Sequence, residues 1–124
     1  MAAVDSSTLI ALFRGDPGPD VDLLKAVLIS GDAVLPPAVL AEVLSDPKLP
    51  ERHRNTISSL PTLDLLPDYW QRTAATRAIL LERGLRARLA DALIAQACID
   101  HDAALIARDR DFRHYVKHCG LKLA

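Results

Sequence analysis

The chain has 124 residues, half of them hydrophobic, which is enough to form one domain with a sizeable core. Its formal net charge of −1 excludes a generally basic surface, so a nucleic-acid partner would have to be bound by a local patch. No apolar run reaches the roughly 18 residues of a membrane span, and the N-terminus lacks a secretory pattern, so we expect a soluble, cytoplasmic protein.

Short runs rich in Val, Leu and Ile alternate along the chain with longer runs of helical period. This alternation is typical of an α/β domain with a mostly parallel sheet. In chain order we predict a strand at Ala2–Val4, a helix to Arg14, a helix at Asp20–Ser30, a strand at Ala33–Leu35, a helix of about nine residues around Glu42, a helix at Pro50–Leu60, a strand at Leu63–Leu66, a helix at Asp68–Arg83, a helix from near Asp91, a strand at Ala104–Ala107, a helix at Phe112–His118 and a strand at Leu121–Leu123.

Five acidic residues follow the predicted strands or lie near the starts of the helices. Asp5 follows the first strand, Glu42 lies in the helix after the second, Asp91 opens a later helix, and Asp109 and Asp111 follow the fourth strand. In a parallel α/β sheet the strand C-termini and the helix N-termini lie at one edge, where such folds bind ligands. We therefore expect these carboxylates to converge.

Each of these acids also has a simpler interpretation. Asp5 and Asp91 could cap helices, although Ser6 or Ser7 could equally cap the first one. Glu42 could be a solvent-facing residue of a short amphipathic helix, and the sequence IARDRDF around Asp109 could be a polar turn. A shared site explains all of these positions by one cause.

Clustered carboxylates repel one another, so either their pKa values rise or a cation binds among them. Asp and Glu oxygens are hard ligands that suit Mg²⁺ or Mn²⁺, and such sites bind substrate phosphates at their open positions. This pattern indicates metal-assisted hydrolysis of a phosphodiester. A histidine site is poorly supported, because HYVKH has Tyr115 where the zinc-protease motif requires Glu.

The arginines are concentrated in the second half of the chain. Eight of the 11 lie between positions 72 and 113, whereas the first 50 residues contain only Arg14. A solvated helix face explains most of them, and contacts with the phosphates of a substrate are the alternative interpretation.

Four segments, in this order and spacing, resemble the PIN-domain ribonucleases, especially the VapC-type toxins of bacterial toxin–antitoxin pairs. They are VDSSTLIALF, the single Glu of LAEVL, ADALIAQACI and ALIARDRDF. The resemblance spans essentially the whole chain. It implies one PIN-like nuclease domain over residues 1–124, a three-layer α/β/α fold with a mostly parallel central sheet of about five short strands.

The resemblance also implies roles for individual residues. Asp5, Glu42, Asp91 and Asp109 would be the catalytic and metal-binding acids, holding one or two Mg²⁺ ions, with Mn²⁺ as a substitute. Asp111 would be a supporting or alternative ligand. One departure is Ala107, where family members often carry Thr or Ser, so a hydroxyl that could orient ligands is missing; Ser6 and Ser7 could compensate for it.

The function implied is that of a metal-dependent endoribonuclease, the toxin of a type II toxin–antitoxin system. Its partners would be an RNA substrate, a cognate antitoxin that inserts an Arg or Lys among the carboxylates, and a second copy of the chain. The apolar runs Leu23–Ile29 and Ile79–Leu81 are candidates for the homodimer contact, and the alternative is that they belong to the core. The alternative is a catalytically weak or inactive PIN-like module that binds RNA or protein, which Ala107 and the low overall basicity support.

Overall fold

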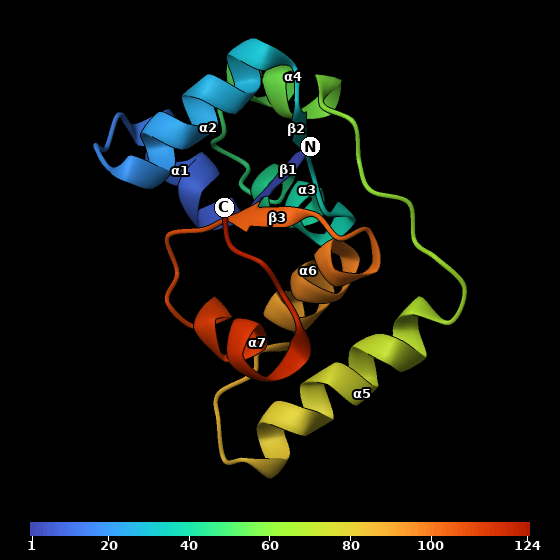
Figure 1. Cartoon of the computed structure of the whole chain (residues 1–124). Helices are drawn as coiled ribbons and strands as arrows, with labels where there is room; N and C mark the ends of the chain where they lie inside the picture. The colour runs from blue at the N-terminus through green and yellow to red at the C-terminus, as the bar shows by residue number, and fades with distance from the viewer.

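The computed structural model describes residues 1–124 and contains seven helices (Figure 1). Every predicted helix is present, with ends close to those expected. In chain order the elements are β1 Ala2–Val4, α1 Ser6–Arg14, α2 Pro19–Ser30, β2 Ala33–Val34, α3 Pro37–Leu44, α4 Glu51–Ser59, α5 Tyr69–Glu82, α6 Leu89–Asp100, β3 Ala104–Ile106 and α7 Phe112–Cys119.

The three strands form a parallel sheet in the order β2-β1-β3, with Ala3 of the central strand opposite Val34 and Leu105. Two single parallel bridges continue the sheet on its outer sides, from Leu35 to Thr62 and from Leu105 to Leu123. The predicted third strand, Leu63–Leu66, begins next to the first of these bridges, and the predicted fifth strand, Leu121–Leu123, contains the second, but neither forms a full strand.

The outer segments are short for local reasons. The segment Leu63–Leu66 lies between Pro61 and Pro67, and proline supplies no N–H to a sheet. The other segment follows Gly120, which ends α7 in the left-handed conformation with a φ of 84°. Each segment forms a single bridge to the sheet.

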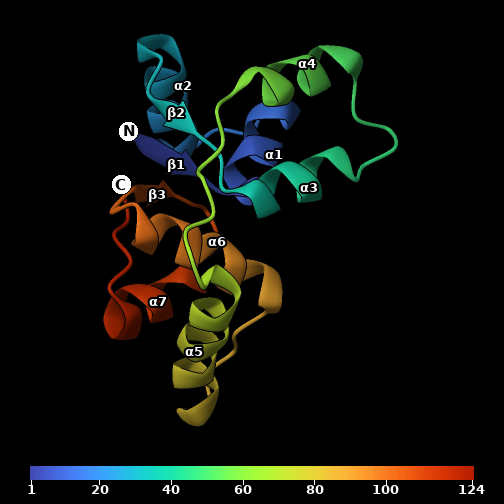
Figure 2. The same ribbon diagram turned by 90° about the vertical axis from the view of Figure 1, so that its right-hand side faces the viewer.

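Helices cover both faces of the sheet, which gives the expected three layers. Helix α2 contacts β2 and β3 on one face, and α6 contacts β3 on the other. Helices α5 and α7 pack against α6 (Figure 2). Because the sheet is covered on both faces, its strands are continuously apolar, and Val4, Leu105 and Ile106 are buried. Phe112 and Tyr115 attach α7 to the same core. No helix combines the length and apolar character needed to cross a bilayer.

Candidate metal centre

Asp5 lies where β1 ends, and it is the N-cap of α1. Its Oδ2 accepts hydrogen bonds from the Ser7 backbone N–H, at 3.1 Å, and from the Ser7 hydroxyl. The expectation that Ser6 or Ser7 caps this helix is therefore wrong, because the residue before them already satisfies the free N–H. The other oxygen, Oδ1, takes part in neither bond, so capping leaves a carboxylate oxygen available for a ligand.

Burial of Asp5 disfavours its charged form. The residue is 4% exposed, and burial raises the pKa of its carboxyl above the ordinary 3.8; the hydrogen bonds from Ser7 oppose this shift, and the negative charge of Glu42 adds to it. A carboxylate in this situation is stabilised by any cation that binds beside it.

Glu42 lies on the exposed surface of α3, so the solvent-facing interpretation is right about its exposure. It is nevertheless held toward the site, because the hydroxyl of Ser6 donates a hydrogen bond of 2.7 Å to Glu42 Oε1. Ser6 thereby links the helix that follows β1 to the helix that follows β2.

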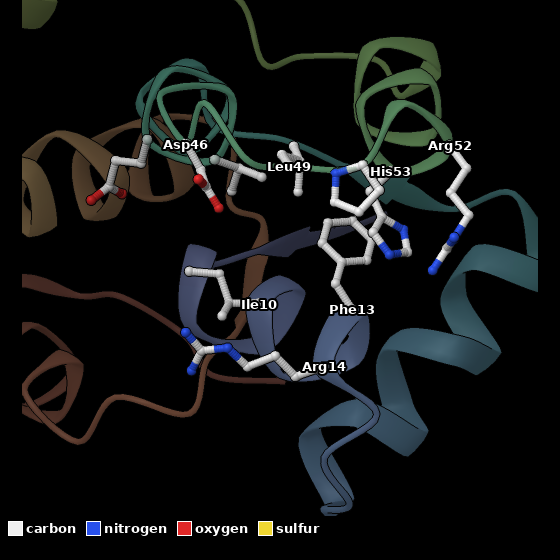
Figure 3. Close-up of a pocket in the computed structure, with 10 residues that line it drawn as sticks. Ile10, Phe13, Arg14, Asp46, Leu49, Arg52 and His53 are labelled. Carbon is white, nitrogen blue, oxygen red and sulfur yellow. The ribbon is translucent and has the colours of Figure 1, made fainter.

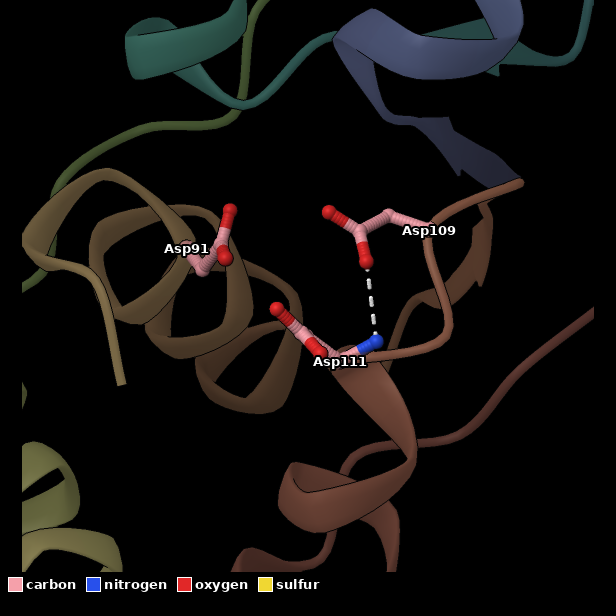
Figure 4. A group of neighbouring side chains, drawn as sticks. All are labelled: Asp91, Asp109 and Asp111. Atoms are coloured by element: carbon pink, nitrogen blue, oxygen red, sulfur yellow. Dashed lines mark hydrogen bonds between the residues drawn. The ribbon is translucent and has the colours of Figure 1, made fainter. Parts of the chain in front are cut away.

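Three aspartates from two elements meet at the site. Asp91, Asp109 and Asp111 each offer a carboxylate oxygen, and these oxygens lie within 4.8 Å of one another (Figure 4). Asp91 comes from the first turn of α6, and the other two come from the loop between β3 and α7. The backbone N–H of Asp111 donates to Asp109 Oδ1 at 2.9 Å, which fixes the loop conformation. Asp109 and Asp111 thus both lie close to Asp91, and either of them could supply the ligand from this loop.

Asp91 is not a helix cap. Helix α6 begins at Leu89, its N-cap is Arg88, and no side chain caps it. The capping interpretation of Asp91 is therefore wrong, because the helix starts two residues before the expected position. Burial raises the pKa of the Asp91 carboxyl; Arg88 opposes the shift, and the negative charges of Asp109 and Asp5 add to it.

Ser7 joins the two halves of the site. Its hydroxyl oxygen accepts hydrogen bonds from the backbone N–H groups of Arg108, at 3.1 Å, and Asp109, at 3.4 Å, while it donates to Asp5. A hydroxyl from α1 therefore contacts the loop where Ala107 lacks one. The sequence singled out Ser6 and Ser7 as supporting residues, and each contacts one of the expected acids.

Sequence reasoning missed two features of the site. Arg88 pairs with Asp91 and Asp109, at 3.3 Å and 2.9 Å, and its position three residues before Asp91 on a helix start is a signal that could have identified it. Arg108 pairs with Asp20 at 3.0 Å and ties the Asp109 loop to the start of α2. No local signal connects two residues that lie 88 positions apart.

A pocket of about 260 Å³ lies beside the site, between α1, α3 and α4, and Glu42 is one of its lining residues. The rings of Phe13 and His53, which stack with their centroids 4.1 Å apart, also line this pocket, as do Arg14 and Arg52 (Figure 3). The exposed carboxylate of Glu42 therefore lies between an acidic centre and a partly apolar, partly basic pocket.

The donors suit a hard divalent cation. The group of three consists of Asp oxygens with no His or Cys, which matches Mg²⁺ or Mn²⁺ rather than zinc. Of the four acids expected to bind metal, Asp91 and Asp109 meet directly. Asp5 and Glu42 lie outside that group, and they are connected to it by Ser7 and Ser6 at the same edge of the sheet.

Comparisons with solved structures show that the fold resembles that of known proteins. The chain is similar in structure to VapBC2 from Rickettsia felis bound to a DNA fragment from their promoter, with a TM-score of 0.73 and 19% identity over 99% of this chain and 96% of that one. It is similar to FitAcB from Neisseria gonorrhoeae, with a TM-score of 0.71 and 18% identity over 100% and 97% of the two chains. It is also similar to VapBC-5 from Mycobacterium tuberculosis, a member of the VapBC family of toxin–antitoxin systems, with a TM-score of 0.68 and 19% identity over 98% and 95%.

In sequence, no curated protein matches the chain. The model of the PIN domain family matches residues 2–117, which include all of the acidic residues discussed above. Because this match covers nearly the whole chain, the protein belongs to the PIN domain family.

Proposed function

We propose that the protein is a metal-dependent endoribonuclease and the toxin of a type II toxin–antitoxin pair. PIN domains are generally nucleases and generally use a divalent metal. The observation that carries the proposal is the convergence of Asp91, Asp109 and Asp111 within 4.8 Å, next to the buried Asp5. An acidic group of this kind, at the C-terminal ends of β1 and β3, is suited to phosphodiester chemistry.

In this proposal Asp5, Glu42, Asp91 and Asp109 hold Mg²⁺ or Mn²⁺, and Asp111 supplies a further oxygen. When bound, the cation lowers the pKa of a water molecule and stabilises negative charge on the phosphate. The chain's own residues set the geometry: Ser7 holds the Asp5 carboxylate and the Asp109 loop together, and Ser6 orients Glu42. Hydrolysis at such a site leaves a 5′-phosphate on one fragment and a 3′-hydroxyl on the other.

The arginines available for phosphate contacts are fewer than the sequence suggests. Arg72 pairs with Asp100, Arg77 donates to the carbonyl of Ala87, and Arg108 pairs with Asp20. Arg83, Arg110 and Arg113 are exposed and make no ion pair, and they remain candidates for contacts with RNA.

We further propose a cognate antitoxin as the protein partner and a homodimer as the assembly. The structural relatives include VapBC complexes, and one is described as a member of a family of toxin–antitoxin systems. Their likeness in fold over nearly the whole chain supports a partner of the same kind for this protein.

A binding module without cleavage remains the second candidate, and two observations favour it. Ala107 stands where relatives often carry a hydroxyl, and the carboxylates of Asp5 and Glu42 lie outside the group of three aspartates. A protein with a distorted acidic centre could bind RNA or a partner through the same surface without hydrolysing a phosphodiester.

Cleavage of an RNA panel separates the two candidates. Purified protein, freed of any partner and given Mn²⁺, is compared with Asp5→Asn, whose side chain can still cap α1. Asp102→Asn is the matched control, because this aspartate is exposed and pairs with Lys122 away from the site. We expect wild type and the control to cut RNA, chelation to stop them, and Asp5→Asn to be inactive. RNA binding by wild type without any cleavage would favour the binding module.

A further inference from the structure

Arg88 is a cation placed inside the acidic group. Its guanidinium donates from Nε to Asp91 Oδ2 at 3.3 Å and from Nη2 to Asp109 Oδ2 at 2.9 Å, so it bridges the two elements that carry these carboxylates. The side chain of Arg88 is 52% exposed, whereas that of Asp91 is 10% exposed. The positive charge thus covers the acidic group from its solvent side.

We propose that Arg88 competes with the divalent cation for Asp91 and Asp109, and that the displaced guanidinium then binds a phosphate of the RNA. This inference rests on the proposed function, since it concerns the same metal centre and the same substrate. Arg88 would then bind two anionic groups in succession, first the carboxylates of Asp91 and Asp109 and then a phosphate of the RNA.

Competition follows from the atoms involved. The two oxygens that accept from Arg88 belong to two of the three residues that converge within 4.8 Å, so a metal held by that group needs carboxylates that Arg88 already contacts. Two cations that share the same carboxylates repel each other, and the loss of a charge-assisted hydrogen bond opposes metal binding.

No other arginine near the site has these contacts. Arg86 Nε lies 3.9 Å from Asp111 Oδ2, which is too far for a hydrogen bond, and Arg110 makes no ion pair although it stands between Asp109 and Asp111. The guanidinium of Arg108 makes its hydrogen bonds outside the group of three aspartates, to Asp20 and to the carbonyl of Pro17.

Arg88 is also free to change partners. Both of its side-chain hydrogen bonds go to Asp91 and Asp109, so no other contact holds the guanidinium when a metal takes those carboxylates. Its backbone stays in place as the N-cap of α6. A guanidinium has a planar array of donors that fits a phosphate, which makes an exposed arginine at the edge of a metal centre an effective phosphate ligand.

A purely structural role for Arg88 predicts the opposite effect on metal binding. If Arg88 served to hold Asp91 and Asp109 in position, its removal would disorder them and weaken metal binding. If it competes, its removal leaves two uncompensated carboxylates and strengthens metal binding. The sign of the change therefore distinguishes the two roles.

The first measurement is calorimetric titration of Mn²⁺ into partner-free, metal-free protein, without RNA. We expect Arg88→Gln to bind Mn²⁺ about threefold to tenfold more tightly than wild type, the range expected when two partly exposed charge pairs are lost. Arg110→Gln removes the same charge nearby without removing an ion pair, and we expect its affinity to stay within about twofold of wild type. Equal or weaker Mn²⁺ binding by Arg88→Gln overturns the inference.

The second measurement is cleavage kinetics at Mn²⁺ concentrations that saturate each protein. We expect Arg88→Gln to raise the KM for RNA, and Arg88→Lys to restore part of it, because lysine keeps the charge without the planar fork. An unchanged KM overturns the phosphate contact. Failure of wild type and Arg88→Gln alike to bind Mn²⁺ overturns the proposed function together with this inference, whereas Mn²⁺ binding that is equal in both overturns only the role of Arg88.

Discussion

At the scale of single residues, Asp5 and Asp91 place negative charge in a buried environment, where Ser7 donates hydrogen bonds to the first and Arg88 pairs with the second. Burial raises the pKa of both carboxyls. Between the unfolded pKa and the raised folded pKa, the native state holds more protons than the unfolded state, so stability falls as pH rises through that window. The two buried carboxylates therefore lower the stability of the metal-free protein, and a bound cation would offset this loss.

This leads to a prediction for Asp5. We expect metal-free wild type to lose stability relative to Asp5→Asn as pH rises above the ordinary carboxyl pKa of 3.8, because only wild type acquires the buried charge. Asp5→Ala should be about 1 kcal/mol less stable than Asp5→Asn, because alanine cannot cap α1. Urea unfolding of the three proteins between pH 4 and pH 8 measures both effects. If the difference in unfolding free energy between wild type and Asp5→Asn does not change with pH, the Asp5 carboxyl has the same pKa in the folded and unfolded protein, and the prediction is wrong.

At the scale of elements, the loop between β3 and α7 is the least regular part of the site and depends on distant anchors. Ser7 of α1 accepts from its backbone, and Arg108 within it pairs with Asp20 of α2, which also accepts a hydrogen bond from Thr8. The loop that carries Asp109 is thus held by the first two helices.

Loss of this anchor should weaken both the fold and the site. We expect Asp20→Asn to lower the Tm and to weaken Mn²⁺ binding, because Arg108 loses its charged partner and the Asp109 loop gains freedom. The hydrogen bond from Arg108 lowers the pKa of Asp20, so this stabilisation is present above the unfolded pKa and is lost as pH falls through the lowered folded value. Thermal melts and Mn²⁺ titration test it, with Asp102→Asn as the control ion pair. The prediction is contradicted if Asp20→Asn and Asp102→Asn give the same melting curve and the same Mn²⁺ titration curve.

The helices and three of the five strands could be predicted from local signals, whereas the contacts between elements could not. Proline and glycine mark helix ends such as that of α5, which ends just before Gly84, and apolar runs mark the buried strands. The start of α6 was misplaced because ADAL reads as a capping sequence, although the helix begins at Leu89. The meeting of Asp91 with Asp109 was predictable, because helix starts and strand ends share one edge of a parallel sheet. The position of Asp5 and Glu42 outside that group and the Arg108–Asp20 pair depend on packing between distant segments.

At the scale of the whole molecule, the acidic centre lies at one edge of the sheet, where Asp109 and Asp111 are partly exposed and a partner can reach them. We expect an inhibitory antitoxin to insert an Arg or Lys among the carboxylates and displace the metal. The contacts of Arg88 show that one guanidinium can span Asp91 and Asp109. Crystallography of the complex with Mn²⁺ present checks this, and a partner that abolishes cleavage while leaving a metal among these acids would disprove it.

Homodimer formation is the second prediction at this scale. The apolar runs named for it expose Ile29 to 87% and Leu81 to 48%, and Trp70 of α5 and Leu89 of α6 are exposed to 63% and 57%. Burial of such side chains favours association with a second copy. We expect light scattering at micromolar concentration to give twice the chain mass. The mass of a single chain would refute the dimer.

The central claim is that Asp91 and its neighbours form one divalent-cation site, and thermal melts with and without Mn²⁺ test it most directly. A ligand that binds only the folded state stabilises it by about 1.4 kcal/mol at a free concentration ten times its Kd. We expect Mn²⁺ to raise the Tm of wild type and of Asp102→Asn equally, and to raise that of Asp91→Asn much less. Without metal, Asp91→Asn should be at least as stable as wild type, since it removes a buried charge. Equal Mn²⁺-induced shifts in all three proteins, with RNA cleavage intact in Asp91→Asn, would contradict the account.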